Sequence, residues 1–287
     1  MLIIEKPSMA ELGKISAAKK MMEWHGLIEY LTPKDCLKHA IDQCKKPIVK
    51  FSGGKASLVV LHQAILLCPD INVMFNNTGV EMPGTAEYIH DLVDKWHLNY
   101  SETQPLDSFW NIVQKHGFPE TRLRGDKRKR IREETGISKK ATPVCCSLLK
   151  ERPSETMIKT MGGDCVIDGI QASESRNRTF LIGDFGMLYF AKSKKRWSCH
   201  PIGLWSDADV WQYIHKNNLP YHPAYDRGYK RTGCLPCTGY LNWKSVLAKC
   251  DPKMLNLILT KQGNPGLLRY LQSKQYMEKH PPCGANT

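Results

Sequence analysis

Short apolar segments alternate with helical patterns along most of this chain, and the alternation limits the folds it can adopt. Strands are predicted at residues 47–51, 71–75, 98–100 and 165–169. Helices are predicted at residues 57–67, 85–96 and 207–217. Strands that alternate with helices form a parallel sheet with crossover helices. We therefore expect an α/β, Rossmann-like fold in which a parallel sheet is flanked by helices.

Three parts are expected along the chain. Residues 1–45 form a small N-terminal helical region, residues 46–245 the α/β domain, and residues 246–287 C-terminal helices and a flexible tail. The sequence holds no apolar run of about 18 residues. Its start carries an acid and no long apolar segment, unlike a signal peptide. We expect a cytoplasmic protein without a membrane partner; self-association as a homo-oligomer is left open.

A glycine-rich loop, Ser52, Gly53, Gly54, Lys55, Ala56 and Ser57, lies between a predicted strand and a predicted helix. Glycines let the backbone approach a ligand, and a helix N-terminus offers free N–H groups to an anion. Lys55 adds a positive charge suited to phosphate. Ligands in such sheets bind at the carboxyl ends of strands. We expect residues 52–57, 76–81 and 169–178 to converge on one crevice there.

The chain is strongly basic, with 41 Lys and Arg against 28 Asp and Glu and a net charge of +13. Such a surface attracts phosphates. The densest basic run covers residues 122–132. It is interpreted either as a solvated face, or as a clamp on a phosphorylated substrate or a nucleic acid. The run lacks interleaved aromatic residues, which argues against single-strand binding by stacking.

Four of the eleven cysteines form a split set, with Cys145 and Cys146 adjacent and Cys234 and Cys237 further along. Four thiolates are the usual complement of one 4Fe-4S cluster or one structural zinc. Adjacent cysteines do not easily chelate one zinc, because neighbouring side chains diverge. Cysteines in an apparently cytosolic chain favour metal binding or catalysis over a disulfide framework.

The loop resembles the SGGKDS motif of the adenine nucleotide alpha-hydrolase superfamily, and the chain resembles the phosphoadenosine phosphosulfate (PAPS) reductase family within it. Residues 76–81 are similar to the DTGxE strand end of that family. The remaining similar segments, in the family's order, are residues 169–176, 200–214 and 220–238. The ordered set spans about residues 48–240 and is more specific than any one motif.

The double cysteine and the CxPCT segment resemble the cluster-binding subset, the adenylylsulfate (APS) reductases and their relatives. This resemblance implies that Cys145, Cys146, Cys234 and Cys237 bind a 4Fe-4S cluster, with zinc as the alternative. It also implies an adenine nucleotide ligand: APS, PAPS or ATP. The implied nucleotide-binding residues are Ser52, Gly53, Gly54, Lys55, Ser57, Thr78, Gly79, Glu81, Gly169, Glu174, Ser175, Arg176 and Arg178.

Two positions depart from the family pattern. Ala56 stands where the superfamily usually has aspartate, which counts against metal-assisted cleavage of pyrophosphate. Gln171 replaces the usual arginine, whereas Arg176 and Arg178 remain. Lys55, by contrast, favours ATP as the ligand, because ATP-using relatives keep this lysine and dedicated sulfonucleotide reductases often lack it. The loop therefore combines features of both groups.

Reductases of this family use a cysteine in a flexible C-terminal tail, within an ECGLH motif. Here the tail has Cys283 and Gly284 without the flanking Glu, Leu and His. Cys283 is the first candidate nucleophile, and an idle tail residue is the alternative. Cys199, next to His200, is the second candidate, and a packed cysteine is the alternative there.

Three functions follow from these patterns. The first is a sulfonucleotide reductase that forms an S-sulfocysteine and draws on a thiol reductant such as thioredoxin. The second is an ATP pyrophosphatase, with Mg²⁺, that acts in sulfur insertion into DNA (phosphorothioation) or RNA. The third is a non-catalytic nucleotide-binding subunit.

Overall fold

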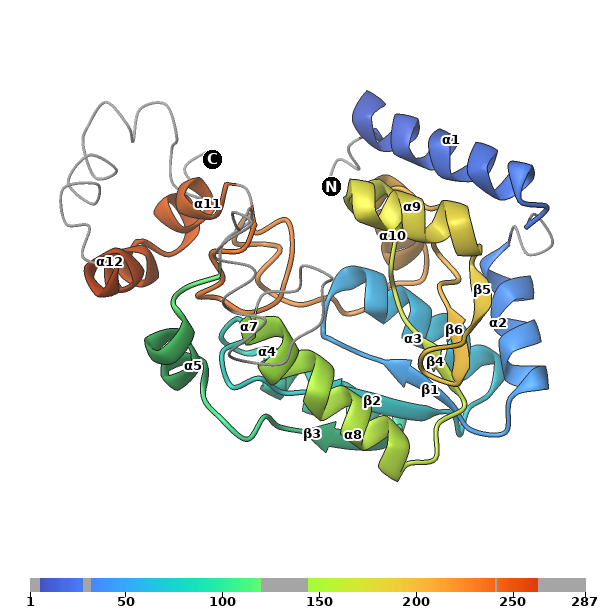
Figure 1. The fold of residues 1–287 in the computed structure, drawn as a ribbon, viewed down its shortest axis with the longest axis horizontal. Helices are drawn as coiled ribbons and strands as arrows, with labels where there is room; N and C mark the ends of the chain where they lie inside the picture. The colour runs from blue at the N-terminus through green and yellow to red at the C-terminus, as the bar shows by residue number, and fades with distance from the viewer. Residues whose placement is uncertain (1–5, 28–31, 120–143, 241, 263–287) are drawn as a thin grey trace. The chain divides into compact units, whose positions relative to one another are not determined.

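The computed structural model describes residues 6–27, 32–119, 144–240 and 242–262 and contains a six-stranded, mostly parallel sheet (Figure 1). The strands are β1 (Pro47–Lys50), β2 (Asn72–Asn76), β3 (Asn99–Thr103), β4 (Cys165–Ile167), β5 (Leu188–Ala191) and β6 (Arg196–Cys199). Their order is β3-β2-β1-β4-β6-β5. β1 pairs in parallel with β2 and β4, and β4 pairs in parallel with β6. The predicted α/β class is confirmed.

Helices connect the strands and extend beyond them. They are α1 (Met9–Trp24), α2 (Pro33–Gln43), α3 (Lys55–Leu67), α4 (Thr85–Trp96), α5 (Phe109–His116), α7 (Val144–Cys146), α8 (Arg152–Thr160), α9 (Arg176–Phe185), α10 (Asp207–Lys216), α11 (Trp243–Cys250) and α12 (Pro252–Lys261). A π-helical turn spans Ser147–Glu151, and a 3₁₀ turn spans Ala172–Glu174. The predicted helices near residues 57–67, 85–96 and 207–217 correspond to α3, α4 and α10.

The edge hairpin β5–β6 is not among the predicted elements. β5 pairs antiparallel with β6, and Lys195 in the connecting turn has a positive φ of 52°. Each strand has only four residues, and basic residues fill the turn between them. Such short strands carry too little alternation to be separated from a loop by pattern alone.

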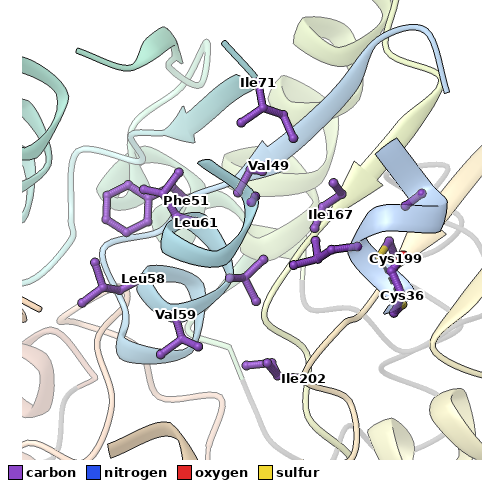
Figure 2. Packing of buried hydrophobic residues seen from close by; sticks show 14 of the residues in the cluster. Cys36, Val49, Phe51, Leu58, Val59, Leu61, Ile71, Ile167, Cys199 and Ile202 are labelled. Carbon is purple, nitrogen blue, oxygen red and sulfur yellow. Dashed lines mark hydrogen bonds between the residues drawn. The ribbon is translucent and has the colours of Figure 1, made fainter. Parts of the chain in front are cut away.

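Helix α3 packs into the main core with nearly all of its faces. Leu58, Val59 and Leu61 have no exposed surface, and they join Val49 and Phe51 of the β1 region in one apolar cluster (Figure 2). A helix that is apolar on all sides is stable only when it is surrounded. This burial fixes the start of α3, and with it the loop that precedes the helix.

The N-terminal helices belong to the same core as the sheet. Ala18 and Met22 of α1, and Cys36, Leu37 and Ala40 of α2, are buried in the cluster that contains β1 and α3. The helical character predicted for this region is therefore present. These helices are part of the sheet unit.

The chain divides into two compact units, each built from separate segments. Unit one comprises residues 1–75, 87–102 and 156–222, and unit two comprises residues 76–86, 103–155 and 223–287. Unit two has its own apolar clusters, one on α11 and α12 and one around Phe109 and Leu149. The three consecutive parts expected from the sequence differ from this interleaved division. Within the described ranges, no helix has both the length and the apolar character needed to cross a membrane.

Candidate functional site

The glycine-rich loop of unit one joins β1 to α3 and leaves the start of that helix uncapped. Gly53 has a φ of 72°, which favours glycine, and the N-cap residue Gly54 has no side chain to bond the first helical N–H groups. Ser57 closes the loop: its hydroxyl donates to the Gly54 carbonyl at 2.8 Å and accepts from the Ser52 N–H at 3.2 Å. Unpaired N–H groups at a helix start attract anions. The glycine-rich loop thus leads into a helix start that has no side-chain cap.

Lys55, the first residue of α3, is only 8% exposed and contacts helix α10. Its Nζ lies 2.9 Å from Oδ1 of Asp207 and 5.6 Å from the centre of the Trp211 ring. Both partners come from the first two turns of α10. The ammonium is therefore held at the loop by a carboxylate and an aromatic face.

The end of strand β4 packs directly on the start of α3. A Cβ on Gly169 would lie 2.7 Å from the Ala56 carbonyl carbon and 2.8 Å from the Ser57 nitrogen. Real side chains do not approach backbone this closely, so only glycine fits. The predicted convergence of residues 52–57 with the segment that starts at Gly169 is present in unit one.

The residue that replaces the family's arginine has a structural role. Gln171 is 2% exposed, and its side-chain amide donates to the carbonyls of Trp205 and Ser206 at 3.1 and 3.3 Å. The Ser173 hydroxyl also donates to the Trp205 carbonyl, at 3.1 Å. These bonds tie the segment after β4 to the start of α10.

The polar residues predicted next in the chain interact with one another. Ser175 caps α9 by accepting from the Arg178 N–H, and Glu174 forms an ion pair with Arg178. The Arg176 guanidinium lies 5.4 Å from the centre of the Phe180 ring. Ser175 therefore acts as a helix cap, and Glu174 neutralises an arginine that was predicted to bind oxyanions.

Replacing Lys55 with methionine tests whether this lysine contributes to nucleotide binding at the loop. We expect nucleotide affinity to fall roughly tenfold or more, because a hydrogen bond to a charged group contributes about 1.5–3 kcal/mol. Isothermal titration with an adenine nucleotide measures the change. Lys216→Ala, an exposed position at the end of α10, is the control and should leave affinity unchanged. Equal affinity in wild type and Lys55→Met would contradict a phosphate role for this lysine.

Unit two holds the TGxE segment beside the CxPC segment. The Thr78 hydroxyl donates to Glu81 Oε1 at 2.6 Å, and its N–H donates to the same carboxylate at 3.0 Å. Glu81 and Cys234 form an antiparallel bridge, and the Leu235 N–H donates to the Val80 carbonyl at 2.7 Å. Thr78 Oγ1 lies 3.6 Å from Cys234 Sγ. Thr78 and Glu81 thus contact the cysteine segment, whereas the Gly79 N–H donates to Asn77 Oδ1 at 3.0 Å.

All four candidate metal cysteines belong to unit two and interact electrostatically. The hydrogen bond with Cys146, and then burial, raises the pKa of Cys145, with further effects from Cys237 and Cys234. The hydrogen bond from Cys145 lowers the pKa of Cys146 to about 7, assisted by Lys150. For Lys150, burial acts to lower the pKa, but the thiols of Cys234 and Cys146 raise it overall. The Lys150 ammonium therefore lies in the neighbourhood of these thiols.

The donor set fits a thiolate-bound group in its chemistry. It consists of four thiols, and the ammonium of Lys150 lies near them in the same unit. In the part of the chain that the structure describes, no three His, Cys, Asp or Glu side chains are arranged to hold a metal ion.

Replacing Cys237 with serine tests the cluster prediction. The anaerobically purified wild type should carry about four iron atoms per chain, and the variant close to none, because one of four thiolate ligands is lost. Metal analysis and the visible absorption of the protein measure this. Cys68→Ser, at the C-cap of α3, is the matched control and should keep its iron. Zinc in place of iron in the wild type would contradict the prediction.

Cys199 is not placed as a nucleophile. It is fully buried on β6, and its Sγ lies 3.5 Å from that of Cys36 (Figure 2). Burial, and then the hydrogen bond with Cys36, raises its pKa well above the ordinary value. Thiolate is the reactive form of cysteine, so the structure contradicts the prediction for Cys199. Cys283 and the basic run 122–132 lie outside the described residues.

Two residues that contribute to these sites, Asp207 and Lys150, were not predicted from the sequence. Asp207 was read only as part of a tryptophan-rich motif, and Lys150 was not considered. The signal for Lys150 was its place one helical turn after Cys146. The signal for Asp207 was its place at the start of a helix that follows a β strand, but its lysine partner lies far away in sequence.

Known proteins resemble this chain over the α/β region. The model of the phosphoadenosine phosphosulfate reductase domain matches residues 46–240. An uncharacterized protein from Methanocaldococcus jannaschii is 31% identical over 205 residues, which cover 70% of this chain and 38% of that protein. A phosphoadenosine 5'-phosphosulfate reductase from Xylella fastidiosa is 28% identical over 204 residues, covering 70% and 75%. The chain thus spans well under half the length of its M. jannaschii relative.

A solved structure agrees on the fold. Phosphoadenylyl-sulfate reductase from Candida auris, in a phosphate complex, aligns with a TM-score of 0.53 and 19% identity over 75% of this chain and 94% of that one. The sheet and the loop define an α/β protein of nucleotide-binding type. The chain belongs to the phosphoadenosine phosphosulfate reductase domain family.

Proposed function

We propose that this chain is a sulfonucleotide reductase, which binds APS or PAPS and reduces its sulfate group to sulfite. The observation that carries the proposal is the uncapped start of α3, with Gly53, Gly54 and Lys55, in a chain of this family. A nucleotide phosphate would accept from the first N–H groups of α3 and bind Lys55.

The sulfur chemistry requires a thiolate nucleophile, for which Cys283 is the candidate. Its thiolate sulfur attacks the sulfate sulfur, so a sulfur–sulfur bond forms while the bond from sulfur to the bridging phosphate oxygen breaks. The nucleotide leaves with both electrons of that bond as AMP or adenosine bisphosphate. The product on the enzyme is an S-sulfocysteine.

A dithiol completes the reaction. One thiolate of a donor such as thioredoxin attacks the Cys283 sulfur and releases sulfite, and its second thiol then forms a disulfide and frees Cys283. Sulfur passes from the +6 to the +4 state, and the dithiol loses two electrons. A tail that carries the nucleophile would have to close over the nucleotide before the first step.

Cys145, Cys146, Cys234 and Cys237 would hold a 4Fe-4S cluster in unit two, and zinc is the alternative occupant. The cluster would supply fixed charge without a change of oxidation state. Lys150 supports this assignment, because its ammonium offsets the negative charge of a thiolate-bound group.

The second candidate is an ATP pyrophosphatase acting in sulfur insertion into nucleic acid. Lys55 favours it, because a buried lysine at the loop suits the additional phosphates of ATP. It would require Mg²⁺ and a contact with DNA or RNA through residues 122–132. Ala56 counts against it, since the loop brings no carboxylate for the metal. A non-catalytic nucleotide-binding subunit is the third candidate.

The fate of the nucleotide tests the proposal. Anaerobically purified protein is given APS, PAPS or ATP separately with a dithiol, and the products are separated by chromatography. We expect AMP from APS, or adenosine bisphosphate from PAPS, with an equal amount of sulfite. AMP and pyrophosphate from ATP, without sulfite from either sulfonucleotide, would overturn it in favour of the second candidate. Binding without turnover would favour the third.

A further inference from the structure

The ammonium of Lys55 has partners that come from another helix. Asp207 Oδ1 lies 2.9 Å from Lys55 Nζ, and the Trp211 ring lies 5.6 Å from the same nitrogen. The lysine side chain is 9% exposed, whereas that of Asp207 is 50% exposed. One member of the ion pair is thus buried at the loop, and the other borders solvent.

The backbone at Asp207 is fixed from two directions. Ser206 caps α10, and a reciprocal capping box with Asp209 holds this first turn. The Asp207 N–H also donates to Glu11 Oε1 of α1 at 3.4 Å. Lys14, on the same helix, donates to the Ser173 carbonyl at 2.9 Å. Helix α1 precedes the segment that matches the family, but it braces the residue that pairs with the loop lysine.

Burial and charge explain why this pair exists. An ammonium with little exposure is costly unless it is paired. The loop supplies no carboxylate of its own, because position 56 is alanine. A bound phosphate would place a second anion at the same ammonium, and two anions a few ångströms apart repel each other. The half-exposed Asp207 carboxylate can turn back into water at low cost, whereas Lys55 remains buried.

We propose that Asp207 is an exchangeable counter-ion of the nucleotide site. Its carboxylate pairs with Lys55 when no nucleotide is bound and is displaced by the phosphate when a nucleotide binds. This competition lowers the affinity for the nucleotide and speeds the release of the product. This inference rests on the proposed nucleotide site. Asp207 is a positioning residue that acts through Lys55. A purely structural role predicts the opposite change in nucleotide affinity when Asp207 is replaced. Loss of a structural contact weakens binding, whereas loss of a competing anion strengthens it.

Asp207→Asn tests the inference in the full chain. Asparagine keeps the size of the side chain and an acceptor for Lys55 but removes the charge. We expect AMP and inorganic pyrophosphate to bind about three- to tenfold more tightly, with slower dissociation, because a repulsive charge near the phosphate is gone. Asp207→Glu keeps the charge and should restore wild-type affinity. Asp94→Asn, at an exposed position of α4 in the same unit, is the control for charge alone and should change affinity far less.

The double variant Lys55→Met/Asp207→Asn completes a thermodynamic cycle. When Lys55 is absent, removal of the Asp207 charge should increase the affinity for the two probes markedly less than it does in the wild-type background. Unchanged or weaker binding of both probes by Asp207→Asn, or equal gains in Asp207→Asn and Asp94→Asn, would overturn the inference. If wild-type protein binds neither probe nor APS, the proposed nucleotide site itself fails. The two failures are therefore distinguishable.

Discussion

Replacing Cys283 with serine should reduce sulfite release roughly a thousandfold or more, because loss of a covalent nucleophile removes the route by which the sulfate sulfur is attacked. Nucleotide affinity should stay close to wild type, since the proposed phosphate contacts come from the loop at residues 52–57 and serine removes only the nucleophilic sulfur. Sulfite release and nucleotide titration, measured on the same preparation, separate the two effects.

Cys68→Ser provides the matched control for that experiment. Cys68 lies at the C-cap of α3 in unit one and has no role in the proposed reaction. It should retain both sulfite release and affinity. Full activity in the Cys283 variant would contradict the assignment of the nucleophile, because no other thiol was predicted for this role after Cys199 was placed in the core.

Gly169→Ala should both destabilise unit one and weaken nucleotide binding by more than tenfold. The added Cβ would lie 2.7 Å from the Ala56 carbonyl carbon, which is backbone and cannot rotate away. Forcing atoms into a packed site typically costs about 1–3 kcal/mol. Relief of the clash must displace the start of α3, where the phosphate would bind. Urea unfolding and nucleotide titration measure the two effects.

Gly13→Ala is the matched glycine control. Gly13 lies within α1, and an added Cβ would meet no atom within 4 Å. Alanine in a helix interior is favoured over glycine by about 0.8–1.0 kcal/mol. This variant should therefore be slightly stabilised and bind nucleotide normally. A Gly169→Ala protein with wild-type stability and affinity would show that β4 and the loop are not packed as described.

The parts of the fold that could be predicted are elements with a long hydrophobic pattern or with residues that clearly mark their start or end. The strand at 47–50 contains Ile48 and Val49, two glycines follow at 53 and 54, and α3 continues as an apolar helix. The hairpin β5–β6 has only four-residue strands, and its pairing depends on tertiary context. The division into two units could not be predicted either, because each unit is assembled from segments that lie apart in sequence.

The candidate site was predictable where residues act through the backbone. Gly53 has a positive φ, Gly54 is the N-cap residue of α3, and Gly169 packs so closely on Ala56 that a Cβ does not fit. Side-chain roles were harder to predict. Whether Ser175 binds a ligand or caps a helix depends on where α9 begins, and the partner of Lys55 depends on how α10 packs.

A single-turnover experiment tests the central claim most directly. Protein is mixed with APS or PAPS radiolabelled at sulfur, in the absence of any dithiol, and the label on the protein and the released nucleotide are both counted. We predict one nucleotide released per labelled chain, with the label discharged as sulfite when a dithiol is added. Nucleotide release without label on the protein, or no reaction with either sulfonucleotide while ATP is cleaved, would contradict the claim.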